Sequence, residues 1–234
     1  MSLVDNVIAD MKRGKASGLD GLSAENLQYS HPANCLILSN LFNFIIEVRC
    51  VPDDFGLAYT VPLPKNMYSN FNRSMTVDDF RGISISQVIS KVFERCVLSR
   101  YESFFVSSDN QFGFKRWAAW LKLFACNLYC KICGSGSTVN LCALDVKKAF
   151  DKLNHFGLFL KLMDRLIPSG LLSVLEHWLN ISATCVRWCD HFSDFFTVAC
   201  GVRQGGVLSP YLFAIYVDDI VAKINTSDLG CMIG

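Results

Sequence analysis

An aspartate follows an apolar run in Leu141–His155, LCALDVKKAFDKLNH. Asp145 comes directly after small and apolar residues, a pattern typical of a buried strand that ends on a carboxylate. A buried carboxylate costs free energy unless a cation meets it. A divalent metal ion is the usual cation in such a place, and phosphoryl or nucleotidyl transfer is the usual chemistry. The alternative is an aspartate that only caps the turn after the strand.

A second segment whose residues could take part in chemistry is Gly201–Val221, GVRQGGVLSPYLFAIYVDDIV. It places Gln204 and Gly205 just before a Leu-Ser-Pro sequence. Glycine lets the backbone approach a ligand closely. Ser209 is a good N-cap and Pro210 suits the first turn of a helix, so a helix is expected to begin here.

Both segments resemble motifs of reverse transcriptases. LDVKKAFD is similar to the first palm motif of that family, an aspartate followed five residues later by an aromatic, and GVRQGGVLSPYLFAIY is similar to the second. Further blocks stand in the family's order: KASGLDG at 15–21, VPLPK at 61–65, DDFRGISISQVISKVFE at 78–94 and QFGF at 111–114. Within the family, the chain resembles the non-LTR (LINE-type) retrotransposon group.

The resemblance implies nucleotidyl transfer from a dNTP to a primer 3′-hydroxyl by a two-metal mechanism, with Mg²⁺ or Mn²⁺ as cofactor. By that resemblance Asp145 is a shared metal ligand, assisted by the backbone carbonyl of Val146. Phe150 matches the aromatic that lies beneath the sugar and rejects a 2′-hydroxyl; the alternative is a plain core aromatic. Gln204 and Gly205 match the loop that packs on the incoming nucleotide.

Two cationic residues match those that reach the triphosphate in the family. These are Lys65 and Arg81, which would form charge-assisted bonds to phosphate. The alternative for both is a solvated surface charge. Arg203 and Lys115 are expected along a template groove. Asp151 fits the first palm motif without a clear metal role, and a turn or helix-start anion is the simpler interpretation.

The sequence Tyr216-Val217-Asp218-Asp219 spells the retroviral-type catalytic signature, but its surroundings predict a helix. One face of that helix would carry the apolar residues Leu212, Phe213, Tyr216, Val217, Ile220, Val221 and Ile224. The two aspartates would then lie on the opposite, solvated face, near Ala214 and Ile215. The resemblance places the catalytic pair further on, after a Gly-rich entry that DLGCMIG at 228–234 is similar to. We therefore expect a chain truncated before the catalytic Asp-Asp hairpin and inactive by itself.

Periodicity predicts the elements that would position these residues. Helices are expected over 2–12, 36–48, 87–104, 117–133, 156–166 and 171–179, and extended segments over 59–63, 80–86, 184–188 and 195–198. The buried side of the second helix is expected to carry Ile37, Leu41, Phe44, Ile45 and Val48. Pro62 and Pro64 should confine the first strand to a sheet edge.

The fold class implied is α+β, a right-hand polymerase with fingers and a partial palm. The expected division is residues 1–137 for an N-terminal extension and fingers, and 138–234 for the partial palm. The palm would be built like a split β-α-β sheet. No thumb is expected in this chain.

Composition indicates a folded globular chain, because 51% of its 234 residues are hydrophobic and 18% are charged. The net charge of +1, from 22 basic and 21 acidic residues, is not the strongly basic balance of many nucleic-acid binders. Nucleic-acid binding would therefore depend on local placement of cations. The eleven cysteines, without a secretory signal, predict reduced thiols. Their spacings do not form two Cys-x-x-Cys halves, which disfavours a zinc site.

The start, MSLVDNVIAD, lacks the apolar core of a signal peptide, and no run is long enough for a membrane span. An intracellular location, in nucleus or cytoplasm, is expected, with no membrane partner and an unassigned oligomeric state. The partners implied by the resemblance are an RNA template, a DNA primer and a dNTP. The function expected is that of a fragment of an RNA-directed DNA polymerase. The alternative is a non-catalytic nucleic-acid-binding or interaction remnant of a degraded retroelement.

Overall fold

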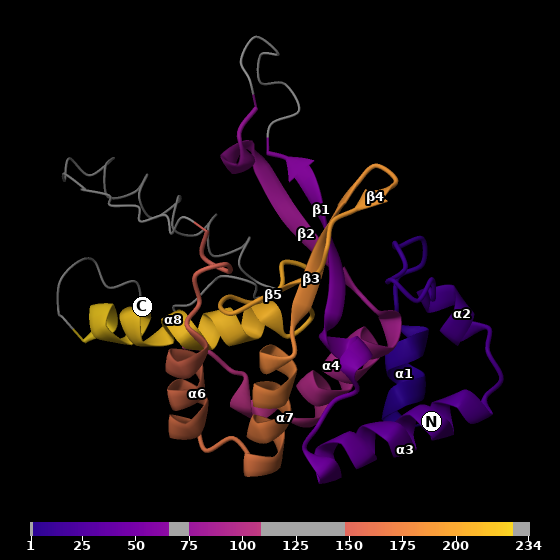
Figure 1. The fold of residues 1–234 in the computed structure, drawn as a ribbon. Helices are drawn as coiled ribbons and strands as arrows, with labels where there is room; N and C mark the ends of the chain where they lie inside the picture. The colour runs from indigo at the N-terminus through magenta and orange to yellow at the C-terminus, as the bar shows by residue number, and fades with distance from the viewer. Residues whose placement is uncertain (1, 66–74, 109–147, 227–234) are drawn as a thin grey trace, which may run out of the picture.

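A mixed sheet connects distant parts of the sequence. The computed structural model describes residues 2–65, 75–108 and 148–226. In these ranges the strands form a five-stranded sheet in the order β2-β1-β3-β4, with β5 also pairing with β3 (Figure 1). The strands are β1 (Leu57–Pro64), β2 (Phe80–Ser86), β3 (Ala183–Trp188), β4 (His191–Phe192) and β5 (Phe196–Thr197). The class is therefore α+β. The extended segments predicted over 184–188 and 195–198 correspond to β3 and β5, which pair antiparallel, and β4 lies between them in sequence.

Strand β1 differs from the prediction of an edge strand. It pairs antiparallel with β2 from Ala58 to Pro64, and parallel with β3 from Leu57 to Thr60. The first half of β1 is therefore central. Pro62 and Pro64 lie in the second half, which pairs with β2 only. Because proline has no N–H to give to a second neighbour, the edge prediction holds only for that half.

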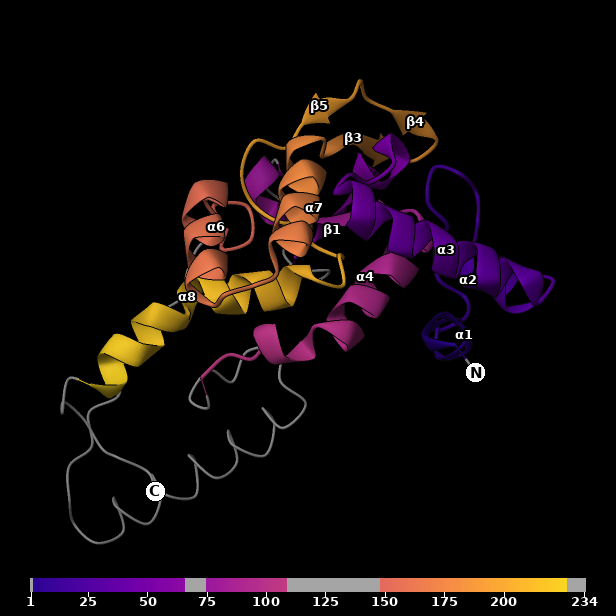
Figure 2. The ribbon, with the colours of Figure 1, turned by 90° about the horizontal axis from the view of Figure 1, so that it is seen from below.

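Helices pack below and beside the sheet (Figures 1 and 2). The α-helices are α1 (Leu3–Ala9), α2 (Ala24–Gln28), α3 (Ala33–Val48), α4 (Val88–Arg100), α6 (His155–Asp164), α7 (Ser169–Asn180) and α8 (Ser209–Asn225). Short 3₁₀ turns are η1 (Asp53–Gly56), η2 (Val77–Asp79) and η3 (Glu102–Phe104). Helix α7 contacts α3 and α6, and α6 contacts α8. The predicted helix at 117–133 lies outside the described residues.

One hydrophobic core joins the segments on both sides of residue 137. Val92 and Phe93 of α4 are almost fully buried, as are Leu158 of α6, Val174 of α7 and Ile215 of α8. The helix predicted over 87–104 is α4 at Val88–Arg100, and its buried residues include Val88, Val92, Phe93, Cys96 and Val97. The division into fingers and palm at residue 137 stays a prediction.

Helix α3 buries only part of the predicted side, since Ile45 is buried and Leu41 packs against the core. Leu38, Phe42 and Ile45 are buried, whereas Ile37 and Phe44 are 62% and 57% exposed. The helix carries apolar residues on several sides, so periodicity alone could not select the side that packs.

In the described part of the chain, no helix is long and apolar enough to cross a membrane. The six cysteines in these ranges are free thiols.

Candidate nucleotide site

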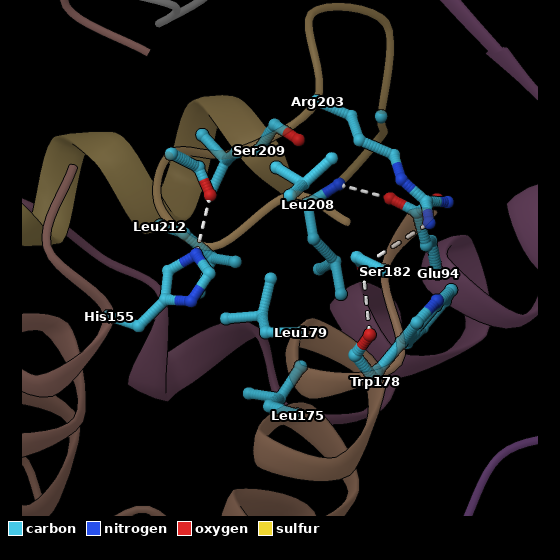
Figure 3. Close-up of a pocket in the computed structure, with 14 residues that line it drawn as sticks. Glu94, His155, Leu175, Trp178, Leu179, Ser182, Arg203, Leu208, Ser209 and Leu212 are labelled. Carbon is cyan, nitrogen blue, oxygen red and sulfur yellow. Dashed lines mark hydrogen bonds between the residues drawn. The ribbon is translucent and has the colours of Figure 1, made fainter. Parts of the chain in front are cut away.

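The loop that contains Gln204 and Gly205 begins beside the turn after the first palm-like motif. The amide of Val202 donates to the carbonyl of Phe150 at 2.8 Å, and the amide of Gly201 donates to the carbonyl of Leu153 at 2.7 Å. Gly201 has a φ of +85°, and a Cβ there would lie 2.6 Å from the Phe150 carbonyl oxygen. Glycine is thus required where the two segments meet. His155 also contacts this junction, with Nε2 2.7 Å from the Gly201 carbonyl oxygen (Figure 3).

The loop then docks on the backbone of β2. The amide of Ser84 donates to the carbonyl of Gln204 at 2.7 Å. Gly205 has a φ of +127°, and a Cβ at this position would lie 2.4 Å from the Ser84 carbonyl oxygen. Gln204 Nε2 donates to Asp151 Oδ1 at 3.3 Å. The second motif therefore contacts both β2 and the turn after the first motif.

Cations gather where β2 begins. Lys65 Nζ donates to the backbone carbonyl of Asp78 at 2.7 Å, and Lys148 Nζ lies 2.8 Å from the Asp78 carboxylate. The hydrogen bond from Lys148 and its positive charge lower the pKa of Asp78. Arg81 is exposed on β2, opposite Leu63. It lies three residues from Ser84, or about 10 Å along the strand.

Two charged residues, the buried Glu94 and the half-buried Arg203, hold the loop in place. Glu94 of α4 is buried, and its Oε2 accepts the amide of Leu208 at 2.7 Å (Figure 3). Arg203 donates to the carbonyl of Phe55 at 3.1 Å and to Ser182 Oγ at 3.2 Å, and it also donates to the carbonyl of Gly56. Burial raises the pKa of Glu94, while the Leu208 amide and the charge of Arg203 oppose that rise. These contacts tie the loop to α4, η1 and the start of β3.

A small cavity lies between the loop and the helices below it. Its lining includes Glu94, His155, Trp178 and Leu212 (Figure 3). Its volume is about 50 Å³, far below the ~300 Å³ at which ligand sites for drug-sized molecules begin. The accessible side of the loop, toward β2 and the 148–151 turn, is therefore the candidate site.

The structure brings together several of the predicted residues. Gln204 contacts β2 and Asp151, and Gly205 lies against β2. In the turn that carries Phe150, Lys148 pairs with Asp78, whose backbone carbonyl accepts a hydrogen bond from Lys65. Phe150 is half-buried and its ring packs on Phe213 of α8, with centroids 5.1 Å apart. That contact agrees with the alternative of a core aromatic and leaves its role beneath a sugar as a prediction.

Asp145 and Val146, the predicted metal ligands, lie outside the described residues, as does Lys115. Within the ranges that are described, no group of three or more His, Cys, Asp or Glu residues could hold a metal ion. The expectation that Arg203 lies along a template groove is wrong, because backbone carbonyls and Ser182 already take up its guanidinium.

The Tyr-Val-Asp-Asp sequence is helical, as predicted, because it lies inside α8. The predicted face is confirmed only in part: Leu212 is buried and Asp219 is exposed, as expected, but Ala214 and Ile215 are also buried and Ile220 is 59% exposed. Asp218 therefore points toward neighbouring segments. It contacts Arg165 at 2.6 Å and accepts the Ser108 amide at 2.9 Å, whereas Asp219 pairs with Lys161 at 2.7 Å.

Sequence reasoning missed Ser84 and Glu94. Ser84 acts through its backbone, which no side-chain pattern can indicate. Glu94 did carry a signal, since it is an acid beside Val92, Phe93 and Cys96 in an otherwise buried stretch of helix. A buried carboxylate requires hydrogen-bond donors, and here the Leu208 amide is one.

Comparison with known proteins gives one matching family model, described as "Reverse transcriptase (RNA-dependent DNA polymerase)", over residues 63–233. The chain is 28% identical over 223 residues to the probable RNA-directed DNA polymerase from transposon X-element of Drosophila melanogaster, covering 93% of this chain and 24% of that protein. It is 26% identical over 237 residues to the RNA-directed DNA polymerase from mobile element jockey of the same organism, covering 97% and 25%. It is also 26% identical over 213 residues to the Pol polyprotein from the type-2 element R2DM, covering 85% and 18%. The chain spans about a quarter of the length of the first two relatives.

Proposed function

We propose that this chain, which belongs to the reverse transcriptase (RNA-dependent DNA polymerase) family, forms the nucleotide-binding part of an RNA-directed DNA polymerase. The Gln204–Gly205 loop would pack on the incoming dNTP beside β2. Lys65 and Arg81 would contact the triphosphate. The fingers and partial palm, divided near residue 137, are part of the same proposal.

The observation that carries the proposal is the docking of the loop on β2. The Ser84–Gln204 hydrogen bond and the close approach of Gly205 to Ser84 join two segments that are far apart in the sequence. Lys65, Lys148 and Arg81 supply positive charge near the same strand. Lysine and arginine side chains form charge-assisted hydrogen bonds with a triphosphate.

By resemblance to the family, Asp145 and the Val146 carbonyl would hold Mg²⁺ or Mn²⁺. Bound there, the metal ions would activate the primer 3′-hydroxyl and steady the leaving pyrophosphate. The residues of the described part would bind and orient the nucleotide. RNA template, DNA primer and an intracellular location, in nucleus or cytoplasm, complete the proposal.

The test measures binding of a fluorescent dNTP in the presence of an RNA–DNA primer–template and Mg²⁺. Arg81→Gln should weaken dNTP binding about tenfold, because it removes a charge-assisted bond worth roughly 1.5 kcal/mol. Arg49→Gln, at the far end of α3, is the matched control and should leave binding unchanged. Equal dNTP affinity in Arg81→Gln and wild type would exclude Arg81 from the site.

Hybrid binding without any dNTP binding would instead support a non-catalytic nucleic-acid-binding remnant. A titration of the RNA–DNA hybrid over a salt series separates these outcomes, since real phosphate contacts make the affinity fall steeply with salt.

A further inference from the structure

A second cavity lies on the N-terminal side of the molecule. Its lining does not include Lys65, Arg81, Gln204 or Gly205, although Val207 of the same loop borders it. It is bounded by the 12–24 segment between α1 and α2, the end of β2 and the first turns of α4. Figure 1 shows α1 beside α4, with α2 on the far side of α1. Its volume is about 160 Å³, too small for a drug-sized ligand and suited to a small ion or group.

The charged residues of its lining are all cations. They are Lys12, Lys15, Lys91 and Arg95, and the remaining lining residues are apolar or serine. Lys12 and Lys15 are exposed at the mouth, whereas Lys91 and Arg95 are half-buried. Four like charges around one cavity repel each other, and that arrangement is stabilised by an anion.

The four cations also have few interactions with other described side chains of the protein. Among the described residues, none of them has a side-chain hydrogen bond or an ion pair within 4.0 Å, and the Nε of Arg95 is buried without a partner. Burial lowers the pKa of Lys91, although the charges of Glu94 and Asp20 oppose that effect. The neighbouring Arg13 differs, because its Nε donates to Gln28 at 2.8 Å and its guanidinium lies over Tyr29.

We propose that this cavity binds a phosphate group through Lys12, Lys15, Lys91 and Arg95. The phosphate would belong either to a nucleic-acid strand or to free inorganic phosphate. The strand source rests on the proposed function, whereas the free-phosphate source does not. Val207 also lines the cavity, so a strand held here would lie beside the loop that contains Gln204 and Gly205.

The first arm of the test uses single-stranded RNA and the RNA–DNA hybrid over a salt series. Lys12→Gln/Lys15→Gln should weaken binding and reduce the slope of log affinity against log salt by up to roughly 0.7–0.9, because the single phosphate contact of the cavity contributes about that much. The control variant Arg49→Gln/Lys223→Gln removes the same charge at exposed sites elsewhere and should keep the wild-type slope.

The second arm measures thermal unfolding in sodium phosphate against sodium chloride at equal ionic strength. A ligand that binds only the folded chain raises the midpoint. Free phosphate as the ligand predicts a higher midpoint in wild type and in the control, and no rise in Lys12→Gln/Lys15→Gln. Because both lysines are exposed, these variants should fold like wild type.

A changed slope supports a strand phosphate, and a phosphate-dependent midpoint supports a free one. Wild-type slope in the variant together with no phosphate effect in any protein would overturn the proposal. If wild type binds no nucleic acid, the proposed function fails, but the phosphate arm still tests the cavity.

Discussion

Two carboxylates in this chain have similar partners and opposite properties. Glu94 accepts the Leu208 amide near Arg203, and Asp218 accepts the Ser108 amide in contact with Arg165. Burial raises the pKa of Glu94. Burial also tends to raise the pKa of Asp218, but the Ser108 amide and Arg165 outweigh it, so that pKa is lowered.

The difference follows from depth and from distance to the cation. Glu94 is 7% exposed, and the guanidinium of Arg203 donates hydrogen bonds to backbone carbonyls and to Ser182. Asp218 has a 16% exposed side chain and a guanidinium nitrogen at 2.6 Å. Glu94 thus holds the candidate nucleotide loop at a cost in desolvation, whereas Asp218 is an ordinary stabilising partner between helices. The pair Asp218–Asp219 is therefore used structurally in this arrangement.

The largest effect is expected for Glu94→Leu. This change leaves the Leu208 amide without an acceptor and Arg203 without its nearby negative charge. The expected loss in free energy of unfolding is about 3 kcal/mol, measured by urea denaturation. A loss below about 1 kcal/mol would contradict the role of Glu94 as an anchor of the loop.

Glu94→Gln sharpens the same point through pH. The raised pKa means that the folded chain binds the proton more tightly, so wild type loses stability as pH rises from about 4.3 through the folded pKa of Glu94. Lys91 and Arg203 face this carboxyl and favour its charge. The stability of Glu94→Gln relative to wild type should therefore increase with pH in urea melts between pH 4 and 8. A constant difference would contradict the raised pKa.

Asp218→Asn should cost about 1 kcal/mol, because the amide can still accept from Ser108 but loses the charge opposite Arg165. The lowered pKa of Asp218 makes this difference fully present above pH ~4, and it disappears as pH falls through the folded pKa. Paired thermal melts at pH 7 and pH 3 measure it. A deficit that grows on acidification would be the wrong sign.

Asp219→Asn is expected to have the smallest effect, below about 0.5 kcal/mol, since the Asp219 side chain is 62% exposed, although its partner Lys161 is half-buried. The double variant Asp218→Ala/Asp219→Ala should leave dNTP affinity unchanged in the fluorescence assay described above. Loss of dNTP binding in a variant that still folds would show that these aspartates belong to the nucleotide site.

Much of the architecture follows from sequence pattern, where one face of an element is clearly apolar. Helix α4 is an example, because Val92, Phe93 and Cys96 alternate with polar residues at helical spacing. For helices α3 and α8 the sequence predicts the position in the chain but only part of the buried face, since both helices are apolar on several sides. The position of β1 between β2 and β3 depends on residues 183–186, far along the chain, and no local pattern contains that information.

The candidate site divides in the same way. The family motifs identify Gln204, Gly205 and Arg81, because side-chain type and order carry the resemblance. The contacts that position them depend on backbone atoms of Ser84 and on buried polar groups such as Glu94. Long-range contacts of that kind appear only in the folded structure.

The most direct test of the central claim is dNTP affinity in Gly205→Ala, measured with primer–template and Mg²⁺ present. A Cβ at 205 would lie 2.4 Å from the Ser84 oxygen and must displace the loop, whereas the control Gly170→Ala places its Cβ 3.7 Å from the nearest atom. We predict at least about tenfold weaker dNTP binding in Gly205→Ala, with hybrid binding and the Gly170→Ala control unchanged. Wild-type dNTP affinity in Gly205→Ala would contradict the assignment of this loop to the nucleotide.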